Sequence, residues 1–422
     1  MKIVGIIAEF NPFHNGHMYL FDKTKKMFPD AIYVLIMSGN FTQRGEPSIL
    51  DKRSKTEIAL MAGFDLVVEL PFPFATASSD VFAEGAIKLA HALGVTDLVF
   101  GSESDDLTYL EEMTDIELYD RSFDSLVRVY LASGLNYPSA RSQAFTDITG
   151  KSISLPNDIL ASSYLKSIKK NNYNIEAHSI KRTNDYNSNQ LETNISSASS
   201  IRMALLDGKV ITEQVPDFVI PYLENIKDRV ITSDNYFKYL KYKLITDNNN
   251  NSYPSLDKSL LNKLKKNVTR VSSYDELINS VKTKNITYRK IARGLLYYLC
   301  DFTVDAKDKM SSITYIRILG ISSKGRSYLN KIKKDCSIPI ISKFTREKDA
   351  MLAFEYKTTI IYSLEYNNKY NVIDDEFTYN IAWSIATKGN RARGKIFAQL
   401  NNIAYRKISK KYKDYIDNTN IE

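Results

Sequence analysis

Hydrophobic residues in the first half of the chain form short continuous runs that alternate with longer amphipathic stretches. The short runs have the length and composition of buried strands and cover residues 2–9, 31–39, 66–70, 96–101 and 174–180. The longer stretches follow the helical period and cover residues 17–28, 51–62, 79–93, 106–149, 157–170 and 196–206. Strands that alternate with helices predict the α/β class, here a Rossmann-like parallel sheet with helices on both faces.

The second half of the chain has a mainly helical pattern. Pro216 marks the expected end of the first region, and a polar run at residues 247–253 marks a possible break. Strand-like runs occur at residues 312–319 and 338–341. We therefore predict a first domain at residues 1–215 and a mainly helical, basic α+β region at residues 216–422.

The composition is that of a globular protein with more than one domain. The chain has 422 residues, 43% of them hydrophobic, and no run approaches the roughly 20 apolar residues of a membrane span. Glu9 interrupts the apolar start, which argues against a secretory signal, and the two cysteines are too few for a disulfide framework. These features predict a cytoplasmic protein with no membrane span and no evident protein partner.

The charge is unevenly distributed along the chain. Residues 1–250 contain 25 Lys and Arg against 32 Asp and Glu, a balance of −7, whereas residues 251–422 contain 32 against 17, a balance of +15. Such a basic half predicts a polyanionic partner, with nucleic acid the first candidate. The alternative is a solvated lysine-rich surface, which a compositional bias of the genome can also produce.

Two histidines, His14 and His17, follow the first predicted strand and open the next predicted helix. The free N–H groups of a helix N-terminus suit a phosphate, and Gly16 lets the backbone approach it closely. We predict that both histidines are catalytic, because His-x-Gly-His at this place resembles the nucleotidyltransferase motif, whose two histidines hold a triphosphate and stabilise charge developing at its α-phosphorus. Next to a triphosphate, either could be cationic. The alternatives are an ordinary turn and a zinc site, although no further cluster of zinc ligands accompanies them.

A serine-rich turn at residues 195–202 offers a second group for phosphate. Ser199, Ser200 and Arg202 can supply hydroxyls, backbone N–H groups and a positive charge at a helix start. An ordinary serine N-cap with a surface arginine is the alternative.

Other candidates lie where predicted strands or helices begin or end. Gly101 closes the fourth strand and permits close approach of a nucleoside, Asn157 begins a helix, and Arg182 follows the fifth strand. A plain strand-end glycine and a helix cap are the alternatives for the first two. The loop at residues 38–47 is either structural or able to close over substrate, through Asn40, Gln43 and Arg44.

Several segments together resemble the bacterial tRNA(Met) cytidine acetate ligase family, within the nucleotidyltransferase superfamily of the His-x-Gly-His type. The matching segments are GIIAEFNPFHNGH at residues 5–17, MSGNFTQRGEP at 37–47, VVELP at 67–71, FGSE at 100–103 and YIRILGISSK at 315–324. His-x-Gly-His marks only the superfamily, whereas NPFHNGH combined with SGNFTQRGEP is much narrower. The serine motif SSASSIR departs from the family pattern and leaves open which hydroxyl meets which phosphate.

The resemblance implies an ATP-dependent ligase. Family members convert ATP and acetate into acetyl-adenylate and pyrophosphate, and then transfer acetyl to N4 of the wobble cytidine of elongator tRNA(Met), giving N4-acetylcytidine. The implied ATP-binding residues are Ile7, Ala8, Glu9, Phe10, Asn11, Pro12, Phe13, His14, Asn15, Gly16, His17, Met18, Tyr19, Leu20, Gly101, Asn157 and Arg182. Mg²⁺ is plausible with the triphosphate, although no carboxylate pair marks a metal site.

Basic residues of the second half are the candidates for contacts with tRNA phosphates. They are Arg289, Lys290, Arg293, Lys324, Arg326, Arg391, Arg393 and Lys395. Two other functions remain open from the sequence: an adenylyltransferase for a small phosphorylated metabolite, and a non-catalytic RNA-binding protein with a degenerate nucleotide fold.

Overall fold

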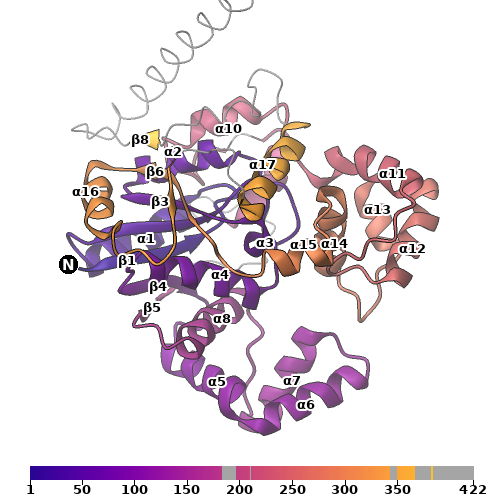
Figure 1. The fold of residues 1–422 in the computed structure, drawn as a ribbon, viewed down its shortest axis with the longest axis horizontal. Helices are drawn as coiled ribbons and strands as arrows, with labels where there is room; N and C mark the ends of the chain where they lie inside the picture. Colours follow the sequence, from indigo (N-terminus) through magenta and orange to yellow (C-terminus); the bar gives the residue numbers. More distant parts are fainter. Residues whose placement is uncertain (183–195, 210, 343–348, 366–381, 384–422) are drawn as a thin grey trace, which may run out of the picture.

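The computed structural model describes residues 1–182, 196–209, 211–342, 349–365 and 382–383. One sheet forms its centre, with the strand order β5-β4-β1-β2-β3-β6-β7 and with β8 beside β6 (Figure 1). The strands are β1 Ile3–Ala8, β2 Ile32–Ser38, β3 Leu66–Leu70, β4 Asp97–Ser102, β5 Glu176–Lys181, β6 Ile316–Ile321, β7 Ile340–Ile341 and β8 Ala382–Trp383. The pairs among β1 to β5 are all parallel, so the predicted α/β sheet is confirmed.

The sheet is buried on both faces, which explains the continuous apolar runs. In β2, Val34 and Ile36 belong to one hydrophobic cluster, whereas Leu35 and Met37 belong to a second cluster on the other face. Helices contribute to both clusters, among them α3 Phe72–Ala75, α4 Ser79–Ala92 and α8 Pro156–Lys170 for the first, and α1 Asn15–Met27, α2 Lys52–Ala62, α9 Ala198–Leu206 and α10 Ile220–Ile226 for the second.

The long helical pattern at residues 106–149 forms three helices instead of one. They are α5 Leu107–Tyr119, α6 Arg121–Ala132 and α7 Tyr137–Thr149, and they project from the sheet in the lower part of Figure 1. Asp120 separates α5 from α6 because its side chain accepts from the N–H of Ser122 as an N-cap. Gly134, at φ 95°, and the N-cap Asn136 turn the chain before α7.

The second half supplies a helical region and also returns to the sheet. The helical elements are η1 Ser233–Tyr236, α11 Phe237–Thr246, α12 Lys258–Asn267, η2 Val268–Arg270, α13 Tyr274–Asn279, α14 Tyr288–Cys300, α15 Val304–Lys309, α16 Ser323–Ile332 and α17 Ala350–Ser363. Helices α11 to α14 share a third hydrophobic cluster, at the right of Figure 1. β6 then pairs with β3 in the antiparallel sense. The sheet therefore includes strands from both sides of residue 216, and the division into 1–215 and 216–422 stays a prediction.

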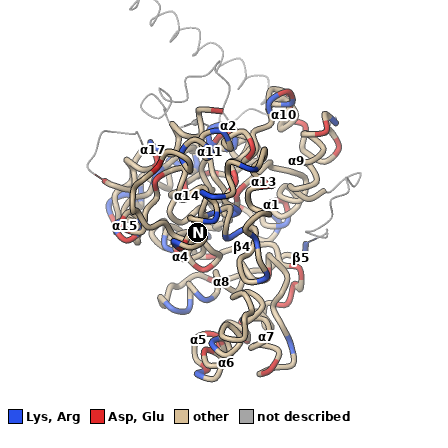
Figure 2. The backbone as a smooth tube through the Cα atoms, turned by 90° about the vertical axis from the view of Figure 1, so that its right-hand side faces the viewer, with Lys and Arg blue, Asp and Glu red and all other residues tan. Residues whose placement is uncertain are grey.

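Helix α14 joins the helical region to the sheet. Its residues Ile291, Leu295 and Tyr298 pack in the third cluster. Tyr297 and Cys300 pack in the first cluster, the one that contains Val34 and Ile36 of β2. Figure 2 shows Lys and Arg interspersed with Asp and Glu over most of the described helices. Among the described residues, no helix is both long and apolar enough to cross a membrane.

Candidate active site

The first turn of α1 fixes His14 and His17 through hydrogen bonds to its backbone. His14 is the N-cap residue, and its Nδ1 accepts from the N–H of Gly16 at 3.0 Å. Nδ1 of His17 accepts from the N–H of His14 at 3.2 Å, which completes a capping box. Because each Nδ1 is an acceptor, the proton of each neutral ring lies on Nε2.

Both imidazoles are neutral in the protein alone. Burial, together with the charges of Arg182 and Arg202, lowers the pKa of His14 to about 3. Burial, His14 and Arg182 lower the pKa of His17 well below its ordinary value. The ring centroids are only 3.9 Å apart, so a proton on one ring opposes a proton on the other. In the protein without nucleotide the pair therefore offers Nε2–H hydrogen-bond donors, and the expectation that either ring could be cationic next to a triphosphate stays a prediction.

The loop before α1 holds His17 in place and connects it to the rest of the site. Phe10 contacts the His17 ring edge-on at a centroid distance of 4.8 Å and adopts φ 49°, a left-handed conformation that is costly for a residue with a side chain. Asn11 is buried, and its Oδ1 accepts from the N–H of Ile49 at 2.9 Å. The predicted ATP loop at residues 7–20 is therefore tied to the loop that follows β2.

Arg44, Ser199 and Arg202, called the arginine–serine cluster below, come together from two loops predicted separately. Nη1 of Arg44 donates to Oγ of Ser199 at 3.1 Å, and Nη2 of Arg202 donates to the same oxygen at 3.3 Å. Nη1 of Arg202 also donates to the carbonyl of Asn11 at 2.8 Å, beside the histidines. Two guanidinium groups on one hydroxyl make a local concentration of positive charge that suits a polyphosphate.

Ser200 differs from Ser199, although both were phosphate-binding candidates. Ser200 is buried, its N–H donates to Oγ of the N-cap Ser197, and its hydroxyl donates to the Ser197 carbonyl at 2.9 Å. Its polar groups are therefore used within the start of α9. Ser199 is the better phosphate candidate of the two.

Gly101 and Arg182 lie side by side at the carboxyl ends of β4 and β5. A Cβ on Gly101 would lie 3.2 Å from Cγ of Arg182, and the N–H of Arg182 donates to the carbonyl of Ser102 at 2.9 Å. Nε of Arg182 is buried without a hydrogen-bond partner among the described residues. Asn157 reaches the same edge of the sheet through Glu103, whose Oε1 accepts from Nδ2 of Asn157. All three nucleoside candidates are therefore near one another.

The substrate-loop candidates divide into two kinds. Asn40 is buried, and its Oδ1 accepts from the N–H of Lys52 at 2.9 Å, so it fixes the start of α2. Gln43 and Arg44 face the predicted ATP loop: the N–H of Gln43 donates to Glu9 at 2.6 Å, and Arg44 belongs to the arginine–serine cluster. Burial raises the pKa of Glu9, while the positive charges of Arg44, Lys55 and Arg202 act in the opposite direction.

Lys55 is a site residue that the sequence analysis missed. It is buried, and its Nζ donates to the carbonyls of Glu9 at 3.0 Å, Ser38 at 2.9 Å and Gly39 at 2.7 Å. It thereby ties the ends of β1 and β2 together, and burial lowers its pKa to about 8. No clear signal was available in the sequence, because other polar residues of α2, Lys52, Thr56 and Glu57, are buried as well.

The basic candidates lie at two separate places. Arg289, Lys290 and Arg293 are on α14, where Arg289 forms an ion pair with Glu46 at 2.6 Å. Lys324 and Arg326 are on α16, at the opposite end of the sheet from the histidines, because Nζ of Lys324 donates to the carbonyl of Ala31, just before β2. The remaining candidates lie outside the described residues: Arg391, Arg393 and Lys395.

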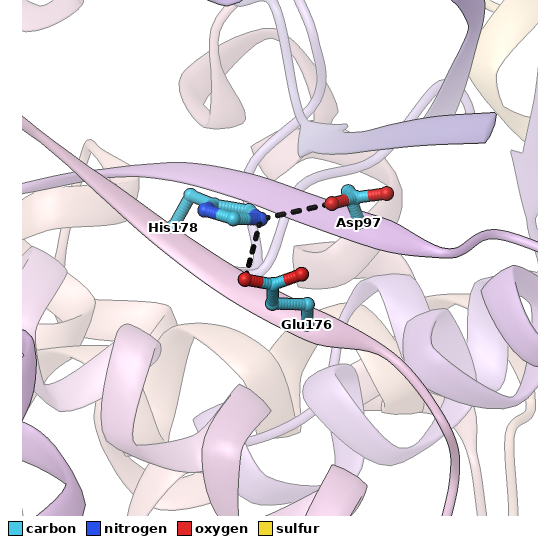
Figure 3. Close-up of side chains that lie close together, drawn as sticks. All are labelled: Asp97, Glu176 and His178. Atoms are coloured by element: carbon cyan, nitrogen blue, oxygen red, sulfur yellow. Dashed lines mark hydrogen bonds and ion pairs between the residues drawn. The ribbon is translucent and has the colours of Figure 1, made fainter. Parts of the chain in front are cut away.

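Asp97, Glu176 and His178 form a group with the geometry of metal ligands at the amino ends of β4 and β5 (Figure 3). Nε2 of His178 lies 3.0 Å from Oδ1 of Asp97. Nζ of Lys2 lies 2.8 Å from the same oxygen, so an ammonium already neutralises the carboxylate. The group is an ion-pair network far from the histidines, and we assign it no metal.

Comparison with known proteins identifies the family. A family model described as HIGH Nucleotidyl Transferase matches residues 1–376. The tRNA(Met) cytidine acetate ligase of Geobacillus sp. strain WCH70 is 34% identical over 394 residues, covering 89% of this chain and 98% of that protein. The protein of the same name from Clostridium acetobutylicum is 36% identical over 399 residues, with the same two shares. The chain belongs to the tRNA(Met) cytidine acetate ligase family.

Solved structures of this family share the fold. The apo crystal structure of Thermotoga maritima TmcAL matches with a TM-score of 0.83 and 28% identity, covering 91% of this chain and 99% of that chain. A second crystal structure of that protein, bound with alpha-thio ATP, matches with a TM-score of 0.81 and 28% identity over the same shares. These findings confirm both the predicted family and the predicted fold class.

Proposed function

We propose that this protein is an ATP-dependent ligase that activates acetate and transfers the acetyl group to the N4 amine of the wobble cytidine of elongator tRNA(Met). Membership of the tRNA(Met) cytidine acetate ligase family supports the reaction, and a relative with alpha-thio ATP supports ATP as the substrate. The observation that carries the proposal is the neutral histidine pair, which presents two Nε2–H donors beside the arginine–serine cluster.

The first step is the attack of an acetate oxygen on the α-phosphorus of ATP. A bond forms between acetate and phosphorus, the bond from the α-phosphorus to the bridging oxygen breaks, and pyrophosphate leaves. Such a step needs positioning and neutralisation of charge, with little covalent help from the protein. His14 and His17 donate to the α-phosphate oxygens, while Arg44, Ser199 and Arg202 hold the β- and γ-phosphates.

The second step is the attack of the cytidine amine on the acetyl carbonyl carbon. The new C–N bond releases AMP as the leaving group, and the amine loses one proton. Acetate becomes a good electrophile only as this mixed anhydride with phosphate, so no nucleophilic serine or cysteine is required. We expect Mg²⁺ to enter with the phosphates of ATP.

Among the candidates in the described part of the chain, Arg289, Lys290 and Arg293 at the start of α14 lie nearer to the histidines than Lys324 and Arg326 do, and we propose that they hold phosphates of the anticodon stem-loop. Arg293 lies next to the loop at residues 40–47, because a Cβ on Gly45 would lie 2.6 Å from its backbone nitrogen. An unstacked wobble base could then reach the adenylate while its neighbouring phosphates stay on α14. Because its proposed substrate is a tRNA, we also propose that the protein acts in the cytoplasm.

Incubation with ATP, labelled acetate and tRNA, followed by nucleoside analysis, tests this function. We expect labelled N4-acetylcytidine in elongator tRNA(Met) only, and pyrophosphate release that requires acetate. Pyrophosphate release that requires a phosphorylated metabolite in place of acetate would contradict the proposal and indicate an adenylyltransferase. The absence of any shift in melting temperature with ATP would contradict every nucleotide-dependent activity.

A further inference from the structure

Glu46 lies between the arginine–serine cluster and the basic start of α14. Its Oε1 is 2.6 Å from Nη1 of Arg289, and its Oε2 is 3.9 Å from Nη2 of Arg202. The first of these arginines belongs to the proposed RNA surface, and the second belongs to the proposed phosphate site. One carboxylate therefore serves two guanidinium groups from different elements.

The backbone around Glu46 is held firmly on both sides. The N–H of Thr42 donates to the carbonyl of Glu46, and the N–H of Gly45 donates to the carbonyl of Thr42, both at 2.9 Å. Gly45, at φ 76°, packs directly on α14, where a Cβ would lie 2.7 Å from the carbonyl carbon of Ala292. Since this backbone is held, we assign a change of partner at Glu46 to its side chain.

The three arginines near Glu46 make its carboxylate important for charge balance. Arg202 is largely buried, and the positive charges of Arg44 and Arg289 act on it. Their mutual repulsion is relieved in the free protein by Glu46 and Glu9. When a phosphate binds either Arg202 or Arg289, the Glu46 carboxylate can pair more closely with the other of these two arginines.

We propose that Glu46 is a positioning residue that makes RNA binding at α14 oppose the binding of the polyphosphate chain at Arg202. When an RNA phosphate engages Arg289, the Glu46 carboxylate turns to Arg202 and competes with the β- and γ-phosphates. The inference rests on the proposed function, and it gives the reaction an order. Acetate is activated first, with pyrophosphate able to leave and rebind, and engagement of the tRNA then favours the departure of pyrophosphate.

Binding of a non-hydrolysable ATP analogue, with and without saturating elongator tRNA(Met), tests the coupling. In the unaltered protein, tRNA should raise the Kd of the analogue by at least about 5-fold, and the analogue should raise the Kd of tRNA by the same factor. Glu46→Gln should remove this effect and, without tRNA, should bind the analogue as tightly as the unaltered protein or more tightly. A merely structural role for Glu46 predicts weaker binding of the analogue instead.

Arg289→Gln and Lys290→Gln are the companion variants. Arg289→Gln removes the half-exposed partner of Glu46, so it should also remove the coupling. It keeps the test valid if Glu46→Gln does not fold. The second removes the same charge from the neighbouring, exposed position and should leave the coupling intact. Coupling that survives in Glu46→Gln or Arg289→Gln, or that is absent from the unaltered protein, overturns the proposal. Acetate-dependent pyrophosphate exchange without tRNA tests the proposed function separately.

Discussion

Replacing His14 by glutamine should make the stability of the protein less sensitive to acid. The folded protein keeps His14 neutral, with a pKa of about 3, whereas an unfolded chain protonates histidine at its ordinary pKa of about 6.5. Below pH 6.5, His14 therefore binds a proton in the unfolded state that it does not bind in the folded state. Above pH 6.5 this difference costs the folded state nothing, and the cost grows as the pH falls towards 3.

The size of the effect follows from the difference in pKa. Each pH unit below 6.5 costs about 1.4 kcal/mol, so the His14 contribution falls by about 2 kcal/mol between pH 6.5 and pH 5. Because the His14 side chain is only 4% exposed, solvent screening reduces this value little. Glutamine still offers an acceptor to the N–H of Gly16, which limits the change in baseline stability.

Urea unfolding at pH 7.5 and pH 5 measures this difference. The loss in free energy of unfolding between the two pH values should be about 2 kcal/mol smaller in His14→Gln than in the unaltered protein. His91→Gln is the control for removal of an imidazole, because His91 is exposed and stacks on Tyr173 away from the site. An equal loss in His14→Gln and the unaltered protein would refute the assignment of a buried neutral histidine.

Three further outcomes follow from the site. Lys55→Met leaves three strand-end carbonyls without their donor, so it should lower the free energy of unfolding by roughly 3 kcal/mol, measured by urea unfolding against the exposed control Lys263→Met. Arg202→Lys loses the forked contact with Asn11 and Ser199, so it should raise the KM for ATP about 10-fold in pyrophosphate exchange; an unchanged KM would remove Arg202 from the phosphate site. Lys290→Gln should reduce the slope of tRNA affinity against salt by about one, whereas Arg326→Gln should not, because α16 lies at the other end of the sheet.

The strands that the sequence predicts well are those whose signal is local. β2 is a continuous hydrophobic run up to Met37 because Val34 and Leu35 are buried on opposite faces of the sheet, so this run is sufficient to identify it. The pairing of Leu66 in β3 with Ile321 in β6 has no such signal, because it depends on the packing of segments far apart in the chain. The position of the second half relative to the sheet was unpredictable for this reason.

The same distinction holds for the site. His14 and His17 are contiguous with the strand and helix that position them, so the motif alone predicted their place. Glu46 gave no signal because its partner Arg289 is remote in sequence, and only the fold brings them to 2.6 Å. The count of charged residues placed the basic residues of α14 and α16 in one group, whereas the two helices lie at opposite ends of the sheet. A count along the sequence cannot show on which side of the fold each basic residue lies.

The most direct measurement of the central claim is acetate-dependent exchange of labelled pyrophosphate into ATP, without tRNA, by the unaltered protein and by His17→Asn. We expect exchange that requires acetate in the unaltered protein and a loss of about 100-fold or more in the variant, because one donor to the developing charge has gone. An unchanged melting temperature would show that the variant is folded. Undiminished exchange by folded His17→Asn would contradict the claim that this histidine pair activates acetate.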